Sequence, residues 1–190
     1  MRNDREATAI PDEEVVSATR VWLERAVIGL NLCPFAKSVQ VKNQIRYAVS
    51  QAQTPEDLLA DFVDELRRLQ TADPAEIDTT LLVHPQVLTD FLDYNDFLEL
   101  TDATIADEGL EGEIQVASFH PRYQFAGTEP ESIENYSNRS PYPTLHLLRE
   151  ASIARAVAVF PDASQIFERN METLRHLGHE GWRRLGVSKS

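Results

Sequence analysis

Several classes of protein are excluded by what this 190-residue sequence lacks. Its single cysteine excludes an internal disulfide framework and a zinc site built from paired thiolates. No apolar run is long enough to cross a bilayer, and the N-terminal stretch MRNDREATAIPDEE lacks the apolar middle region of a secretory signal. Glycine-rich phosphate loops, GxSxG elbows and HExxH motifs are also missing. We therefore expect a cytoplasmic protein with no membrane partner.

Basic residues are scarce as well. The chain carries 18 lysines and arginines against 31 aspartates and glutamates, which gives a net charge of −13. Residues 55–115 hold seventeen of these acids and two bases, whereas residues 31–54 hold three bases and no acid. Solvated helix faces account for most of the acidity. Because duplex nucleic acid requires a basic footprint, we expect no such partner, while a small anionic ligand stays compatible with the segments that lack excess acid.

Alternating helical and strand patterns predict a single α/β domain over residues 11–190, after a disordered segment at 1–10. Apolar residues at helical spacing predict helices near 12–30, 55–69, 91–105, 143–160 and 161–178. Strand patterns cover 44–52, 79–85 and 113–119. This alternation favours a small three-stranded sheet, parallel or mixed, with two additional C-terminal helices. The alternative is an α+β ferredoxin-like fold.

Two of the predicted strands end in the dipeptide His-Pro, at His84 and His120. In a parallel sheet both histidines would stand at the carboxyl edge, where open α/β sheets hold their ligands. Two imidazoles on one rim can act as general acid and base, or bind a metal. Each histidine taken alone is as well explained by a ring that is hydrogen-bonded within the fold. The pair indicates a site only if the two strands are parallel neighbours.

A second candidate group is the stretch NLCPFAK, which contains Cys33 and Lys37. Cys33 follows the end of a predicted helix, where the helix dipole does not lower a thiol pKa. Lys37 or a histidine would have to activate it. The alternative is a small buried thiol, because free cysteine behaves largely as an apolar side chain.

The third candidate group lies in the stretch NRSPYPTLHLLRE, at the end of a long irregular passage from 120 to 143. A helix beginning at Pro143 would offer free amides in its first turn, and with Arg139 beside them they could hold a carboxylate or phosphate. His146, Arg149 and Glu150 would then share one helix face. A structural arrangement of these side chains is an equally good interpretation.

Four motifs in this sequence resemble a bacterial family catalogued as domain of unknown function, number 1415. They are GLNLCPFA, TTLLVHPQVL with DFLDYNDFLEL, GEIQVASFHPRYQFAG and NRSPYPTLHLLRE. The resemblance extends from about the first predicted helix to the last, and it implies a single-domain bacterial protein. It brings no activity, substrate or cofactor. The matching motif residues, to which the family assigns no role, are Cys33, His84, His120, Arg139, His146 and Arg149.

Our leading hypothesis from these residues is a small enzyme that acts on an anionic metabolite. His120, with His84 or His146, would transfer protons. Cys33 would either act as a nucleophile or line the site without reacting. The candidate substrate-binding residues are Lys37, Tyr123, Asn138, Arg139 and Arg149.

Two alternatives belong to other classes. A metal-binding enzyme or carrier would draw its ligands from Cys33, Glu150 and the histidines. A non-catalytic interaction protein would use Tyr136 and Tyr142 of the long loop. The sequence identifies neither a cofactor nor an oligomeric state.

Overall fold

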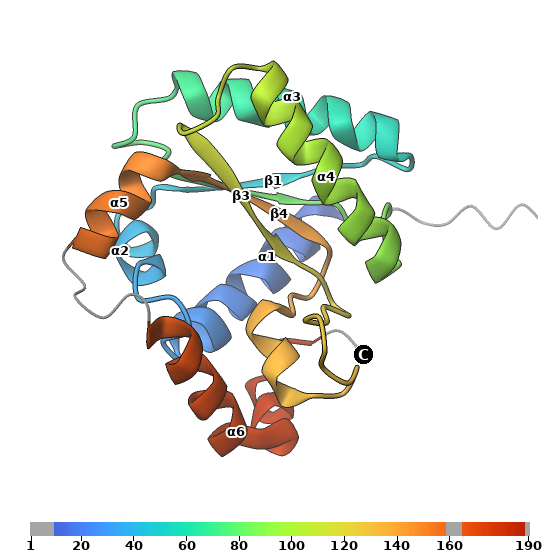
Figure 1. Ribbon diagram of the computed structural model, residues 1–190, viewed down its shortest axis with the longest axis vertical. Coiled ribbons are helices and arrows are strands. Elements are labelled where there is room, and N and C mark those ends of the chain that lie inside the picture. The colour runs from blue at the N-terminus through green and yellow to red at the C-terminus, as the bar shows by residue number, and fades with distance from the viewer. Residues whose placement is uncertain (1–9, 159–164, 189–190) are drawn as a thin grey trace, which may run out of the picture.

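Helices and strands alternate along the chain in the computed structural model, which describes residues 10–158 and 165–188 (Figure 1). The N-terminal part contains α1 (Asp12–Trp22), the π-helix η1 (Leu23–Ile28) and α2 (Ala36–Val41). The central part contains β1 (Ile45–Val49), α3 (Pro55–Thr71), β2 (Thr79–Val83), α4 (Phe91–Asp107) and β3 (Ile114–Phe119). The C-terminal part contains the 3₁₀ helix η2 (Ile133–Asn138), β4 (Thr144–Arg149), α5 (Glu150–Ala158) and α6 (Ile166–Leu185).

In the described part of the chain, four strands form one mixed sheet in the order β1-β2-β4-β3. Strands β1 and β2 are parallel, and β4 runs antiparallel to both β2 and β3. It follows that β1, β2 and β3 all point the same way. The α/β class is confirmed, whereas the predicted number of three strands is wrong by one. The ferredoxin-like alternative requires a β-α-β-β-α-β order, which differs from the order found.

The fourth strand, β4, replaces the first half of the predicted helix at 143–160. Leu145 and Leu147 face α3 and α4, whereas His146 and Leu148 face the other side of the sheet. A short leucine-rich run fits a strand as well as a helix. Here the strand is favoured, because β4 pairs with both β2 and β3 and fills the position between them. The helical prediction is confirmed from Glu150 onward, where α5 begins.

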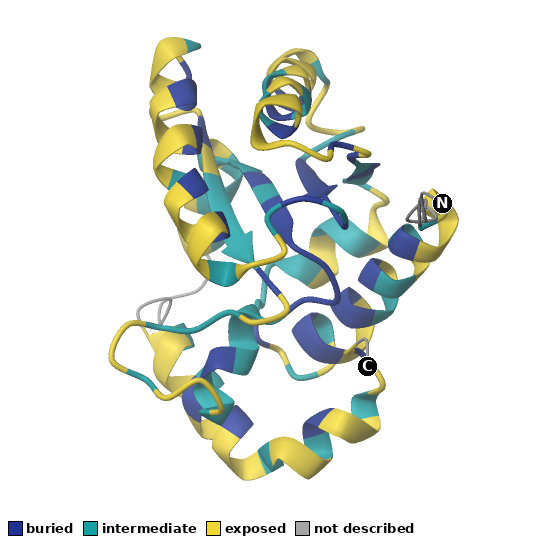
Figure 2. Cartoon of the chain, turned by 90° about the vertical axis from the view of Figure 1, so that its right-hand side faces the viewer, coloured by how far each residue is buried: buried dark blue, intermediate teal, exposed yellow. Residues whose placement is uncertain are grey.

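Helices cover both faces of the sheet. In Figure 1, α3 and α4 lie above the strands, and α1, α2 and α6 lie below them. Buried residues gather in the strands and on the inner sides of the helices, while the outer sides are exposed (Figure 2). The largest apolar cluster fills the space between the sheet and α3 and α4, and includes Phe62, Leu82, Tyr94 and Leu147. A second cluster joins α1 and η1 to α6 through Trp22 and Trp182.

Helix α6 continues beyond its predicted end. Gly178 does leave the helical conformation, with a φ of 64°, but the helix resumes and ends only at Gly186, whose φ is 62°. The segment from His179 to Leu185, which the sequence pattern did not assign to a helix, is helical, and the buried Trp182 packs against the second cluster and keeps this segment on the protein. The predicted helix start at 161, like residues 1–9 of the predicted disordered segment, lies outside the described residues.

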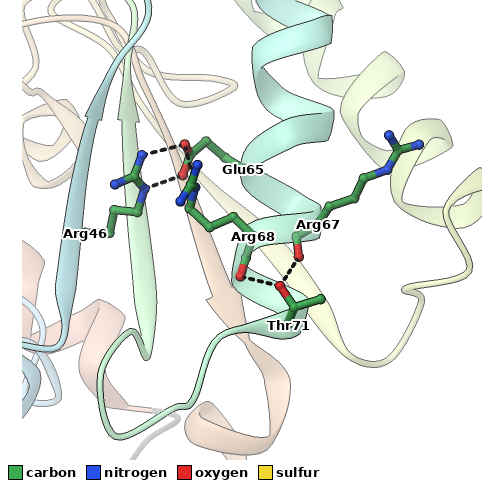
Figure 3. Close-up of polar contacts among 5 residues, drawn as sticks. All are labelled: Arg46, Glu65, Arg67, Arg68 and Thr71. Carbon is green, nitrogen blue, oxygen red and sulfur yellow. Dashed lines mark hydrogen bonds and ion pairs between the residues drawn. The ribbon is translucent and has the colours of Figure 1, made fainter.

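Helix α3 begins as predicted, with the Thr54 hydroxyl accepting the Asp57 amide, and an ion pair ties it to the edge strand β1. Figure 3 shows Arg46 of β1 and Glu65 of α3 pointing toward each other, with two hydrogen bonds of 2.7 and 2.8 Å. Glu65 is only 8% exposed, and its charge is compensated by this bidentate contact. Arg67 points away from this pair and contacts Glu108 at the end of α4.

Candidate functional site

The two His-Pro histidines stand on the same rim of the sheet, because β2 and β3 point the same way. They are not neighbours in the sheet, however, since β4 enters between their strands, so the predicted condition of parallel neighbouring strands is met in direction but not in adjacency. The His84 amide donates to the Pro143 carbonyl (3.0 Å), and the His120 amide donates to the Asn138 carbonyl (3.1 Å). Segment 138–143 therefore occupies the space in which an open parallel sheet would hold its ligand.

Residues 84–90 follow β2, and we call them the 84–90 loop. Both imidazoles, that of His84 within this loop and that of His120 after β3, are hydrogen-bonded to its backbone carbonyls. His84 donates from Nδ1 to the carbonyl of Val87 at 3.0 Å. His120 accepts the Arg122 amide on Nδ1 (3.0 Å), so its proton lies on Nε2, which donates to the Leu88 carbonyl (3.2 Å). Each tautomer is thus defined by its partners.

Arg122 holds the next carbonyl of the same loop. Its guanidinium donates to Thr89 O at 2.9 Å and reaches the Asp90 carboxylate at 3.3 Å. Three successive carbonyls are therefore bound by three side chains, His84, His120 and Arg122. The middle residue, Leu88, has a φ of 54°, which is an unfavourable conformation for a bulky side chain. The 84–90 loop is therefore strained at its centre and held through three of its carbonyls.

Tyr94 of α4 lies between the two histidines. Its ring centroid is 5.7 Å from that of His84 and 5.1 Å from that of His120. Its hydroxyl accepts the Phe119 amide (3.1 Å) and donates to the Thr144 carbonyl (2.8 Å). Tyr94 therefore joins the end of β3 to the start of β4 at the same place where the histidines hold the loop.

The environment of these histidines favours the neutral imidazole. Both side chains are fully buried, and burial lowers the pKa of His84 and the pKa of His120 to about 4. All of the imidazole nitrogens of the pair have partners except one, His84 Nε2, which is buried with no hydrogen-bond partner. An unsatisfied buried polar atom costs about 1–3 kcal/mol, so this nitrogen requires an explanation.

His146, Cys33 and Lys37 do not join this rim. His146 lies in mid-strand on the opposite face of the sheet, where its Nε2 is 2.7 Å from the Thr79 hydroxyl and burial lowers its pKa to about 4. Cys33 packs with the Trp22 cluster on that face, and burial raises the pKa of its thiol. Lys37 lies exposed on α2. The structure therefore separates these three predicted residues from the histidine pair.

The predicted anion site at the first turn of a helix starting at Pro143 is wrong, because a strand begins there. Arg139 instead donates to the carbonyls of Tyr123 (3.2 Å) and Pro130, and its guanidinium lies 4.2 Å from the centre of the Tyr136 ring. Asn138 donates to Ser118 O at 3.1 Å. These predicted substrate-binding residues hold the long loop in place.

Asn135, which the sequence did not single out, organises that loop. Its buried side chain accepts from the Phe125 amide (3.0 Å) and the Thr128 hydroxyl (2.8 Å). It donates to Glu129 O at 2.9 Å and to Pro130 O at 3.2 Å. The tyrosines of the interaction hypothesis also serve the core, since Tyr136 packs 5.2 Å from Trp182.

Arg149 lies at the opposite, amino rim of the sheet, far along β4 from the histidines. Its Nη2 donates to the carbonyls of Leu69, Ala72 (2.8 Å) and Ile77 (3.3 Å), and so caps the end of α3. In a strand, residues three apart face opposite sides, so the predicted common face of His146 and Arg149 is wrong.

A hollow of about 230 Å³ opens beside Arg149 at this amino rim. Gln70, Ser152 and Arg155 also line it. Arg149 Nε is buried without a hydrogen-bond partner.

No group of three or more histidine, cysteine, aspartate or glutamate side chains in the described part of the chain has the geometry of a metal site. Within the same residues, no helix has the length and apolar character needed to cross a membrane.

The motif resemblance is confirmed by a family model described as Protein of unknown function (DUF1415), which matches residues 14–184. The chain belongs to this family. Neither a curated protein nor a solved structure matches the chain. The match to DUF1415 covers every candidate residue described above and assigns a role to none of them.

Sequence reasoning missed two members of the rim, Tyr94 and Arg122. The sequence could have indicated Arg122, because this residue directly follows the second His-Pro pair. Tyr94 carried no such signal, since at helical spacing it reads as a core residue of α4.

Proposed function

We propose that this protein is a small-molecule enzyme that acts on an anionic metabolite, with His84 as its proton-transfer residue. The observation that carries the proposal is His84 Nε2, a buried nitrogen with no hydrogen-bond partner, at the start of a loop whose backbone is strained at Leu88. Unsatisfied atoms and strained backbone persist at a cost to stability, and they cluster at functional sites. This proposal keeps the acid–base chemistry expected from the sequence but gives the leading role to His84 instead of His120.

Displacement of the 84–90 loop would release three groups together. His84 and His120 would lose their carbonyl acceptors, and Arg122 would lose Thr89 and Asp90. The rim would then present a base, a hydrogen-bond donor and a cation, which together suit a carboxylate or phosphate ester. Contact with solvent or ligand would also raise the pKa of His84 from about 4 toward its usual 6.5, close to the optimum for proton transfer near neutral pH.

The sharpest variant is His84→Asn, because the asparagine amide can replace Nδ1–H on Val87 while it removes Nε2. We expect His84→Asn to fold and to lower turnover by about 10²- to 10⁴-fold, the usual contribution of a positioned acid or base. Turnover would be measured by mass spectrometry on a panel of phosphorylated and carboxylated metabolites. His176→Asn, a change at an exposed histidine, is the matched control. Equal turnover by His84→Asn and wild type would remove His84 from the mechanism.

A second candidate function is anion binding in the amino-rim hollow. It is favoured by Arg149 Nε, which is buried without an acceptor while Arg155 lines the same hollow. A nitrogen-15 NMR titration with inorganic phosphate and with malonate separates the two candidates. Shifts confined to the His84 and His120 rings favour the carboxyl rim, and shifts confined to Arg149 and Arg155 favour the hollow.

A further inference from the structure

One edge of the sheet, along β1, has no partner strand in the described part of the chain. The ladder with β2 uses alternate residues, as the bonds from Ser50 N to Val83 O and from Asp78 N to Gln44 O show. In a parallel pair, the backbone groups of the intervening residues point the other way. The amides and carbonyls of β1 at Ile45, Tyr47 and Val49 therefore face outward, and such an edge is a template for another strand.

A groove of about 530 Å³ runs beside this edge, between β1 and α1. Its apolar wall includes Val16, Tyr47 and Val49. In Figure 1, α3 lies above β1 and α1 lies below it, and the groove lies between α1 and this edge strand. The size and the apolar wall of the groove suit a partner that supplies a strand and an apolar side chain.

The two ends of this edge carry opposite charge. Asp12 and Glu13 of α1 line the groove near Val49, where Gln51 donates to the Asp12 carboxylate. Lys42 lies exposed just before the other end of β1, in a segment that contains no acid between residues 31 and 54. Next to it, Val41 is 72% exposed. An edge that is acidic at one end and basic at the other is complementary to itself in antiparallel pairing.

We propose that β1 pairs antiparallel with β1 of a second copy, about Tyr47, to form a two-fold symmetric dimer with one continuous sheet. This register places Lys42 of each copy beside Asp12 and Glu13 of the other, and Val41 beside the apolar wall of the groove. The rest of the surface opposes self-association, because the chain carries a net charge of −13. The interface is therefore confined to β1, the segment just before it and the groove face of α1, where Asp12 and Glu13 meet the acid-free segment of the other copy.

Sedimentation equilibrium of the full chain over about 1–200 μM tests the proposal, since this range spans micromolar dissociation constants. We expect a dimer, and we expect Lys42→Glu to weaken it by at least tenfold through like-charge contact with Asp12 and Glu13. The triple variant Lys42→Glu, Asp12→Lys, Glu13→Lys exchanges both partners and should restore dimerisation. Arg183→Glu makes the same change of charge at an exposed position of α6 and should leave the dimer intact.

Three outcomes would overturn the proposal. The wild-type chain could stay monomeric across the range, Lys42→Glu could dimerise as well as Arg183→Glu, or the triple variant could fail to recover. Amide hydrogen exchange provides an independent measurement, since Tyr47 and Val49 should exchange at least tenfold more slowly in the dimer than in the Lys42→Glu monomer. Equal exchange rates would place the contact on another surface.

Discussion

At both rims of the sheet, side chains donate hydrogen bonds to backbone carbonyls, but the two rims use different side chains. At the carboxyl rim, His84 and His120 donate to the carbonyls of Val87 and Leu88. At the amino rim, Arg149 alone donates to three carbonyls at and just beyond the end of α3. In both places, carbonyls that have no partner in regular secondary structure are satisfied by side chains from the strands.

The choice of side chain follows from the local field and determines what each rim can do. The last carbonyls of a helix carry the negative end of its dipole, which favours a permanent cation such as Arg149. The 84–90 loop has no such dipole, and neutral imidazoles suffice to hold it. A guanidinium keeps its charge at any ordinary pH, whereas an imidazole can gain or release a proton. The amino rim is therefore built for stability, and the carboxyl rim retains a titratable group.

The largest expected effect of a single change is at the amino rim. Arg149→Met should lower the free energy of unfolding by about 3 kcal/mol, because the two hydrogens of Nη2 serve partly buried carbonyls, and a hydrogen bond from a charged group contributes at least about 1.5 kcal/mol. For a chain of this length the melting temperature should fall by about 6–12 °C. Urea unfolding measures the first quantity and calorimetry the second.

Arg155→Met is the matched control, because Arg155 lines the same hollow but donates to the Ser152 hydroxyl instead of the α3 carbonyls. It should change stability by less than about 0.5 kcal/mol. A similar loss for both variants would mean that Arg149 acts through the charge of the hollow and not through the end of α3.

The strands that form these two rims differ in how well the sequence predicts them. Three strands and the start of α3 were predictable because their signals are local, such as alternation at Ile45, Tyr47 and Val49 or the Thr54-Pro55 cap. The strand β4 was not predictable, because its leucines fit both the helical and the strand periodicity. Only its pairing between β2 and β3 makes it a strand. That position exists only once the rest of the sheet has formed.

Some features of the candidate site could likewise be predicted from the sequence and others could not. The sequence placed His84 and His120 on one rim only on the condition that their strands run parallel, and the chain pattern left the strand direction open. Their hydrogen-bond roles did not follow, because they depend on where the loop carbonyls of Val87 and Leu88 lie in three dimensions. For Arg139 and Arg149, the sequence showed two cations but could not show the carbonyls that they bind.

A change of pH should affect the carboxyl rim next most strongly. The pKa of His84 is about 4 in the folded protein and 6.5 when unperturbed, so the unfolded chain binds more protons between these values. Stability is thus complete above about pH 6.5 and falls as the pH decreases toward 4. From about pH 7.5 to about pH 5, His84 should account for a loss of about 2 kcal/mol in the free energy of unfolding.

His84→Asn isolates this contribution, because asparagine does not titrate in this range. The variant should lose about 2 kcal/mol less than wild type between the same two pH values in urea unfolding. Arg149→Met should show the wild-type dependence, displaced by a constant amount. Parallel pH curves for wild type and His84→Asn would show that His84 does not titrate with unfolding and would remove the distinction between the rims.

The smallest expected effect on stability belongs to Arg122→Ala, which removes the exposed side chain and leaves the backbone bond to His120 in place. The ion pair with Asp90 is solvent-exposed, so stability should change by less than about 0.5 kcal/mol. Amide exchange within the 84–90 loop should nevertheless accelerate by about two- to fivefold, since the Thr89 carbonyl loses its donor. Arg175→Ala, at an equally exposed arginine paired with Glu134, should leave that exchange unchanged. Unchanged exchange in Arg122→Ala would mean that the two buried imidazoles hold the loop without help from the guanidinium of Arg122.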